Sequence, residues 1–361
     1  MPNARRLLEM LLIAAAIVAA VLPLPQGAVE RVYSRGIYPM IQPRLTGFSN
    51  AISLSLFDVT AVGVVGAVLL LWVAGLRRAT RGRAFRTIGS LARTTAAVAG
   101  LLYLWFLTAW GLNYRREPLR TELDFQEDRI TEDALHQLAL RDVDSLNMLY
   151  AEANGGAWPE FANLFPLLDP PLVRAERELD MSWRVRAALP KRSLFDFYFR
   201  RVAVDGMTDP FFLETLANQG LLPFERSFVI AHEWGHLAGY ADESEANFFA
   251  WLVCMRGGAR EQYSAWISLY GTIVSAQPPG DRAAIVRRLE PGPRNDLRAM
   301  SERISRQVNP KASRAGYAIY DRFLRANRVR AGIRSYTEVL RLLLGTRFEP
   351  DGTPALRSRQ R

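Results

Sequence analysis

Two apolar stretches that contain no charged residue, 59–76 and 95–112, constrain the fold of this chain more than any other feature. Each is close to the length of about 20 residues that a helix needs to cross a bilayer. A third stretch, 10–24, is shorter and follows two arginines, so a cleaved signal peptide is an alternative there, although no clear small-residue cleavage site follows. We therefore expect three transmembrane helices, near residues 7–25, 55–76 and 94–112.

The loop between the second and third stretches, residues 77–90, carries five arginines, which argues against burial of these stretches in a water-soluble core. Short arginine-rich loops stay in the cytoplasm, and Arg5 and Arg6 should stay there too. With three crossings, both signals agree only if residues 113–361 lie outside the cytoplasm. Residues 1–114 carry 11 basic and 3 acidic side chains, which is +8 of the net charge of +10. The excess charge therefore indicates membrane orientation and gives no argument for nucleic-acid binding.

The remainder of the chain has the patterns of a water-facing, mostly helical domain. Residues 131–153 are periodic, with Thr131 as a candidate N-cap, and residues 154–171 are rich in Gly, Pro and aromatic side chains, which is typical of a loop. The alternation in residues 194–200 predicts a half-buried strand, and residues 211–218 can form a second strand or a helix. Further helices are expected at 224–238, 243–256, 260–275, 281–289, 295–307, 312–326 and 335–344.

The residues with the clearest chemistry are HEWGH, at positions 232–236. In a helix, positions i and i+4 share a face, so His232 and His236 can bind one zinc ion. Glu233 lies beside the first histidine and can act as the general base for a water molecule that the metal makes acidic. A structural zinc is the alternative, although such a site needs no base beside the metal. The surrounding segment is too polar for a membrane helix, so it belongs to the outer domain.

A catalytic zinc usually has three protein ligands, and without a further histidine nearby the third should be a carboxylate. Gly239 can end the first helix in a left-handed conformation. Asp242, followed three residues later by Glu245, has the spacing of a capping box that starts a second helix. These structural roles leave Glu243 as the preferred ligand, ahead of Asp242 and then Glu245. Asn247, one turn after Glu243, could orient one of the metal ligands through a hydrogen bond without contacting the metal itself.

Residues 243–247, ESEAN, resemble the ExxA[DN] element of gluzincin peptidases, which implies that Glu243 is the third ligand. The pattern HEWGHLAGYAD is also similar to a metzincin-like variant in which Asp242 would fill that position, but no clear Met-turn follows it. A broader resemblance covers most of the chain. The segments VERVYSRGIYP, SLFDV, WGLNYRREPL, GMTDPFFLE, HEWGHLAGYADESEANF and GIRSY are similar, in this order, to an uncharacterised bacterial membrane family, domain of unknown function 3810. This resemblance implies membrane anchoring and a zinc-peptidase site, and it gives no substrate; Asp242 departs from the small polar residue expected there.

The other parts of a peptidase site are less specified by the sequence. Peptidases often pair extended substrate with an edge strand, for which FFLETLAN, with Glu214, is the candidate. A connecting element without that role is the alternative. An oxyanion needs a donor, and Tyr336 and Tyr263 are candidates, although each could simply be a packed aromatic residue.

The sequence thus predicts a mainly α fold with a small β element, in which three N-terminal transmembrane helices precede a zincin-like, mostly helical extracytoplasmic domain. The expected parts are a membrane domain at 1–114, a zinc-peptidase-like domain at 115–346 and a flexible tail at 347–361. The leading hypothesis is a zinc metallopeptidase of the bacterial inner membrane that hydrolyses peptide bonds outside the cytoplasm. Its partners would be the lipid bilayer and a peptide or protein substrate. The alternatives are a non-catalytic membrane protein with a structural zinc and a zinc amidase that acts on a cell-wall component.

Overall fold

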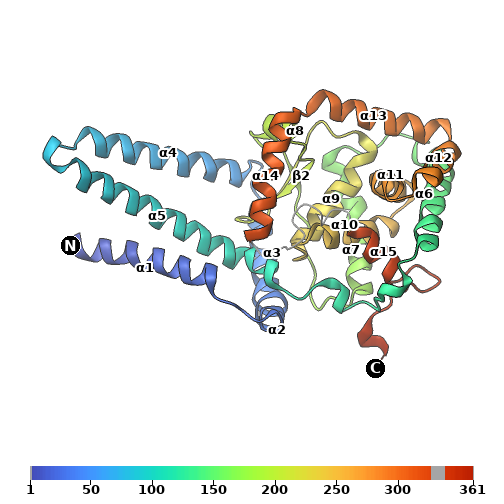
Figure 1. Ribbon diagram of the computed structural model, residues 1–361, viewed down its shortest axis with the longest axis horizontal. Helices are drawn as coiled ribbons and strands as arrows, with labels where there is room; N and C mark the ends of the chain where they lie inside the picture. Colours follow the sequence, from blue (N-terminus) through green and yellow to red (C-terminus); the bar gives the residue numbers. More distant parts are fainter. Residues whose placement is uncertain (1, 327–337, 361) are drawn as a thin grey trace.

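The computed structural model describes residues 2–326 and 338–360, and it is mainly helical, with a small three-stranded sheet. Figure 1 shows three long helices on one side of the molecule and a compact helical domain on the other. The helices are α1 (Pro2–Val21), α2 (Gln26–Ala28), α3 (Tyr38–Asn50), α4 (Leu56–Arg77), α5 (Ala84–Ala109), α6 (Glu132–Ala153), α7 (Leu164–Glu178), α8 (Asp196–Arg201), α9 (Arg226–Leu237), α10 (Glu243–Met255), α11 (Ala259–Ser275), α12 (Pro279–Arg288), α13 (Pro291–Gln307), α14 (Pro310–Ala326) and α15 (Val339–Gly345). The strands are β1 (Pro190–Lys191), β2 (Gly206–Thr208) and β3 (Thr215–Ala217).

Two helices, α4 and α5, are long and apolar enough to cross a membrane. A third crossing is counted only if α1 and the following helical segment, which meet at a bend of 115°, form one broken span. Glycine allows close packing among these helices: a Cβ atom at Gly100 of α5 would meet the carbonyl oxygen of Leu12 in α1 at 3.2 Å. The expectation of apolar N-terminal helices is therefore confirmed for two, with a third possible.

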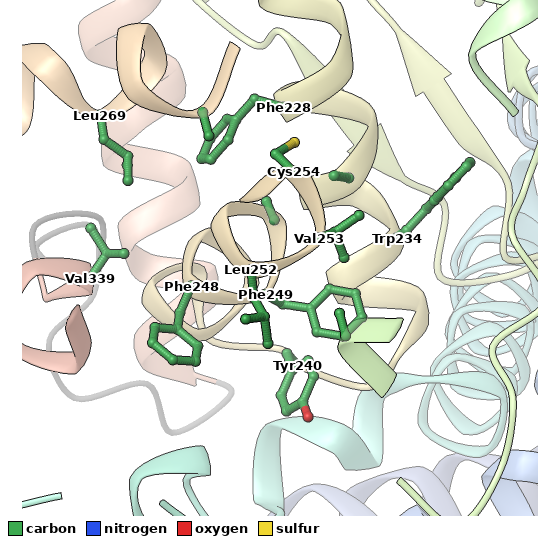
Figure 2. Packing of buried hydrophobic residues seen from close by; sticks show 14 of the residues in the cluster. Phe228, Trp234, Tyr240, Phe248, Phe249, Leu252, Val253, Cys254, Leu269 and Val339 are labelled. Carbon is green, nitrogen blue, oxygen red and sulfur yellow. The ribbon is translucent and has the colours of Figure 1, made fainter. Parts of the chain in front are cut away.

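The helical domain packs around α10, which is buried along almost its whole length. Figure 2 shows Phe248, Phe249 and Leu252 of α10 among aromatic and aliphatic side chains from neighbouring elements. The N-cap of α6 is Thr131, as expected, and its side chain accepts from the backbone N–H of Ala134. The helices expected between residues 224 and 326 are present with small shifts of their ends.

Two elements differ from the sequence prediction. Residues 154–171 were expected to be a loop, but α7 begins at Leu164, because a stripe that includes Leu164, Leu168 and Leu172 is fully buried and outweighs the prolines within the helix. Residues 194–200 were expected to be a half-buried strand, but they form the short helix α8. The alternation misled because Phe197 is exposed, whereas Asp196 is buried and forms an i,i+4 ion pair with Arg200.

The predictions for the sheet and for the C-terminal segment also need correction. Within residues 211–218, only Thr215–Ala217 form a strand, β3, and it lies in the middle of the sheet order β1-β3-β2. The segment 347–361 was expected to be a flexible tail. Its described residues instead return along residues 122–125, where the backbone N–H of Arg347 donates to Asp124 and that of Arg357 donates to Glu122.

Candidate metal centre

The helices α9 and α10 are joined by a short turn that fixes their relative position. Gly239 has φ +90°, and the N–H groups of Gly239 and Tyr240 donate to the carbonyls of His236 and Gly235. These are the two hydrogen bonds of a Schellman motif, so the prediction for Gly239 is confirmed. Asp242 then caps α10 by accepting from the backbone N–H of Ser244 at 2.8 Å.

The two helices approach each other closely where Gly235 faces Ala246. A Cβ atom on Gly235 would lie 3.1 Å from both Cα and the carbonyl oxygen of Ala246, so a larger residue at either position would push the helices apart. The orientation of α9 is fixed on its other side by Trp234, which is fully buried and donates from Nε1 to the carbonyl of Ala188.

This packing brings His232, His236 and Glu243 together. The Nε2 atoms of the two histidines lie 3.2 Å and 3.6 Å from Oε2 of Glu243. One ligand atom from each of the three residues lies within 4.8 Å of the others, and Glu243 is almost completely buried. The candidate ligands ranked first from the sequence therefore form one cluster.

Each imidazole is oriented by a hydrogen bond on the side away from the cluster. His232 Nδ1 lies 2.9 Å from Oδ1 of Asn247, and His236 Nδ1 lies 2.8 Å from the carbonyl oxygen of Tyr240. Both partner atoms are oxygens, which can only accept, so each Nδ1 carries a proton and the Nε2 lone pairs are left to face Glu243. The two Nε2 lone pairs and the Glu243 carboxylate repel one another unless a positive charge lies among them. Either a metal ion or an additional proton on one imidazole can supply that charge. The donor set therefore fits a metal such as zinc.

Electrostatics in the cluster are consistent with this requirement. Burial alone would raise the pKa of Glu243, but the adjacent imidazoles hold it well below its ordinary value. Burial is the largest single influence on the pKa of His236 and lowers it, but the carboxylates of Glu243 and Glu233 and the Tyr240 carbonyl together raise that pKa to about 9. Without a metal, a proton is thus held between these groups, and metal binding would displace it.

Glu233, the candidate base, lies beside the cluster and is held by β2. Its Oε2 accepts from Thr208 Oγ1 at 2.8 Å, and the same hydroxyl lies 2.9 Å from the Glu233 carbonyl. Gly206, at the other end of β2, leaves room for this carboxylate, since a Cβ atom there would overlap Glu233 Oε1. Burial raises the pKa of Glu233, and the two nearby imidazoles oppose that shift.

The remaining acidic candidates lie elsewhere. Asp242 serves as the N-cap of α10 and is not part of the three-residue cluster. Glu245 does not complete a capping box, because its Oε1 accepts from the distant backbone N–H of Leu119 at 2.7 Å. A cavity of about 760 Å³ is lined by Asp242, Ser244 and Glu245 but by none of the cluster residues.

The candidate substrate contacts are not brought to the cluster. Glu214 is fully buried and forms an ion pair with Lys191, while also accepting from the backbone N–H of Phe57. Tyr263 is buried and donates to Asp296 at 2.7 Å. Tyr336 lies outside the described residues. The strand beside the candidate base is β2, whose pairing partner β3 contains part of the segment predicted to be an edge strand.

Sequence reasoning missed two residues that hold the site. Thr208 positions Glu233, and Trp110 donates from Nε1 to the carbonyl of His236 at 2.8 Å, with its ring 6.1 Å from the His236 ring. Both belong to segments that carried the family resemblance, WGLNYRREPL and GMTDPFFLE, which was the available signal.

Residues 33–344 match the family described as "Protein of unknown function (DUF3810)". The chain belongs to this family. No curated protein and no solved structure matches it. The description of DUF3810 assigns no activity, so any function must be argued from the geometry of the site itself.

Proposed function

We propose that this DUF3810 protein is a membrane-anchored zinc metallopeptidase whose catalytic domain lies outside the cytoplasm. The observation that carries the proposal is the convergence of two histidine Nε2 atoms and the Glu243 carboxylate, with a buried glutamate next to them. A set of three protein ligands is typical of catalytic zinc, which keeps a fourth position for water or substrate. Among the described residues, only this group has the arrangement of a metal site.

Each residue has a defined task in peptide hydrolysis. His232, His236 and Glu243 would hold the metal, which when bound would polarise the substrate carbonyl and acidify a water molecule. Glu233 would take a proton from that water as its oxygen bonds to the carbonyl carbon. The same carboxyl would then pass the proton to the amine as the C–N bond breaks. Thr208 keeps the Glu233 side chain in place through its hydroxyl.

The orientation rests on charge and on the apolar helices. The loop between α4 and α5, together with the adjoining ends of these helices, carries Arg77, Arg78, Arg81, Arg83 and Arg86, and such arginine-rich connections remain cytoplasmic. Figure 1 shows this loop at the far end of the helices from the domain, so a cytoplasmic loop corresponds to an outer domain.

The experiment compares the full-length protein, purified in detergent, with two variants. We expect about one zinc ion per chain, lost in His232→Ala and retained in Glu233→Gln. In cells, Glu233→Gln should cause uncleaved envelope proteins to accumulate. If Glu233→Gln leaves the cellular phenotype intact while zinc is present, the site is structural. If cell-wall fragments change instead of proteins, the enzyme is an amidase. A full-length protein with no zinc, together with unchanged stability of His232→Ala, would refute the proposal.

A further inference from the structure

The ends of α4 and α5 mark where the chain passes from these two apolar helices into the domain. The two helices are antiparallel. Trp72 Nε1 donates a hydrogen bond to Thr95 Oγ1, and Gly75 packs against Leu91. This register places the start of α4 level with the end of α5. The start of α4 is marked by the buried Asp58, and the end of α5 is followed by the buried Trp110. Beyond these two residues the chain enters the domain.

Exposed apolar side chains occur on the segments of the domain that lie next to these helix ends in sequence or through the contacts given below. They include Phe48 and Leu54, just before α4, Leu194, Phe197 and Tyr198, at and before α8, and Ile319 on α14. Their exposed fractions run from 47% for Tyr198 to 76% for Leu194. Such residues are costly in water when they are clustered, and clusters of this kind mark interaction surfaces.

Specific contacts fix these segments at the helix ends. Asp58 accepts from the Ser193 hydroxyl and from the backbone N–H of Leu194, and the Phe57 ring packs edge-on against Phe195. The end of α8 is in turn linked to the start of α14, because the N–H of Asn309 donates to the carbonyl of Arg201. Figure 1 shows α14 running across the direction of α4 and α5, between them and the rest of the domain.

Basic side chains accompany the apolar ones. Arg44, Arg192 and Arg201 are exposed on the same segments, and the Arg201 guanidinium lies 5.7 Å from the Phe197 ring centroid. Aromatic, aliphatic and arginine side chains together are the composition of a surface that lies at a bilayer interface, where arginine meets phosphate and the rings enter the headgroup region.

We propose that these side chains form one face of the domain, the membrane-facing belt (Phe48, Leu54, Leu194, Phe197, Tyr198 and Ile319), and that this belt rests in the lipid headgroup region of the membrane that α4 and α5 cross. The occupant is lipid, and the argument is continuity: the belt begins at the residues where the apolar helices end. The belt therefore fixes the height and tilt of the domain above the bilayer, which helices alone do not set.

The position of the belt also bears on the cluster of His232, His236 and Glu243. This step rests on the proposed function. Trp110 follows the last residue of α5 and contacts His236 directly, so the cluster lies at the level of the membrane surface. Seated in this way, the site reaches peptide segments of membrane-bound proteins close to the bilayer, and distant soluble proteins are poor substrates.

The test measures depth with nitroxide labels on the full chain in vesicles of phosphatidylethanolamine and phosphatidylglycerol. Single cysteines replace Phe197 or Ile319 in the belt, and Met148 on α6, which is 74% exposed, is the matched control. The native Cys254 is fully buried, and burial raises the pKa of its thiol, so the parent protein should remain unlabelled. Accessibility to oxygen and to a water-soluble nickel chelate is then compared by electron paramagnetic resonance.

We expect the labels at 197 and 319 to be several-fold less accessible to the nickel chelate than the label at 148, with high accessibility to oxygen. Nickel accessibility equal to that at 148 would show that the belt faces water and would overturn the proposal. Low accessibility to both reagents would show that protein covers the belt, which also overturns it. None of these outcomes depends on zinc or on catalysis, so the failure of the belt and that of the proposed function are distinguishable.

Discussion

Asn247 offers the sharpest test of the metal centre, because it contacts a ligand and never the metal. Its Oδ1 lies 2.9 Å from Nδ1 of His232, a hydrogen bond that fixes both the tautomer and the ring orientation. Asn247→Leu keeps the approximate size of the side chain and removes the acceptor. Asn247→Asp keeps an acceptor and adds a negative charge, which makes the imidazole a stronger base.

The magnitude follows from what this hydrogen bond does. Losing such a partner of a ligating histidine typically weakens metal binding by about 10- to 100-fold, which corresponds to about 1.4–2.7 kcal/mol. We expect Asn247→Leu to fall in this range and Asn247→Asp to bind zinc at least as tightly as the unchanged protein. Because Asn247 is 9% exposed, water cannot readily replace the lost acceptor.

The assay is competition for zinc between the detergent-purified protein and a chromophoric chelator. His136, on α6, lies outside the cluster, so His136→Ala controls for the loss of a histidine that is not a ligand. Circular dichroism checks that each variant is folded. The reasoning is refuted if folded Asn247→Leu binds zinc as tightly as the unchanged protein, or if Asn247→Asp is weakened as much as Asn247→Leu.

Three further predictions test other parts of the structure. Thr208→Val removes the hydroxyl that holds Glu233, so kcat should fall by about 10-fold or more with zinc content unchanged, and an unaltered kcat would contradict the role of Thr208. Lys191→Met leaves the buried Glu214 unpaired and should lower the free energy of unfolding by about 3–5 kcal/mol in denaturant titrations, with recovery in Lys191→Met/Glu214→Leu. Burial raises the pKa of Glu176 to about 7 from 4.5, so its contribution to stability is complete below pH 4.5 and is lost as pH rises through about 7. Glu176→Gln should remove up to about 3 kcal/mol of that pH dependence in unfolding experiments, and an unchanged pH profile would contradict it.

The local parts of the site could be predicted from the sequence. The i,i+4 spacing places His232 and His236 on one face, Gly239 has the backbone freedom to end α9, and Asp242 has the side chain of an N-cap. These features depend only on neighbours within a few residues. The position of Glu243 in the first turn of α10 follows from them, and the structure brings its carboxylate to the two histidines.

The parts that failed depend on partners far away in the chain. Glu245 has the spacing of a capping box, but its carboxylate accepts from Leu119, which lies 126 positions upstream. Phe197 alternates as in a half-buried strand, yet α8 exposes its ring at the domain surface. Glu214 has the composition of a substrate contact, but Lys191 on the neighbouring strand β1 takes it into a buried ion pair. No pattern within a single segment reports such contacts.

The contacts of α9 show that residues 1–114 do more than anchor the chain, because two of them hold the end of this helix. The carbonyls at the end of α9 accept from Trp110 Nε1 and from the Tyr38 hydroxyl, and both rings belong to the same hydrophobic core as α10. The expected boundary between residues 114 and 115 therefore falls inside one packed unit. Trp110 donates its hydrogen bond to the carbonyl of His236, which is a proposed zinc ligand. Removing the N-terminal helices would expose this core and release the end of α9, so we expect the candidate metal centre to keep its geometry only in the full chain.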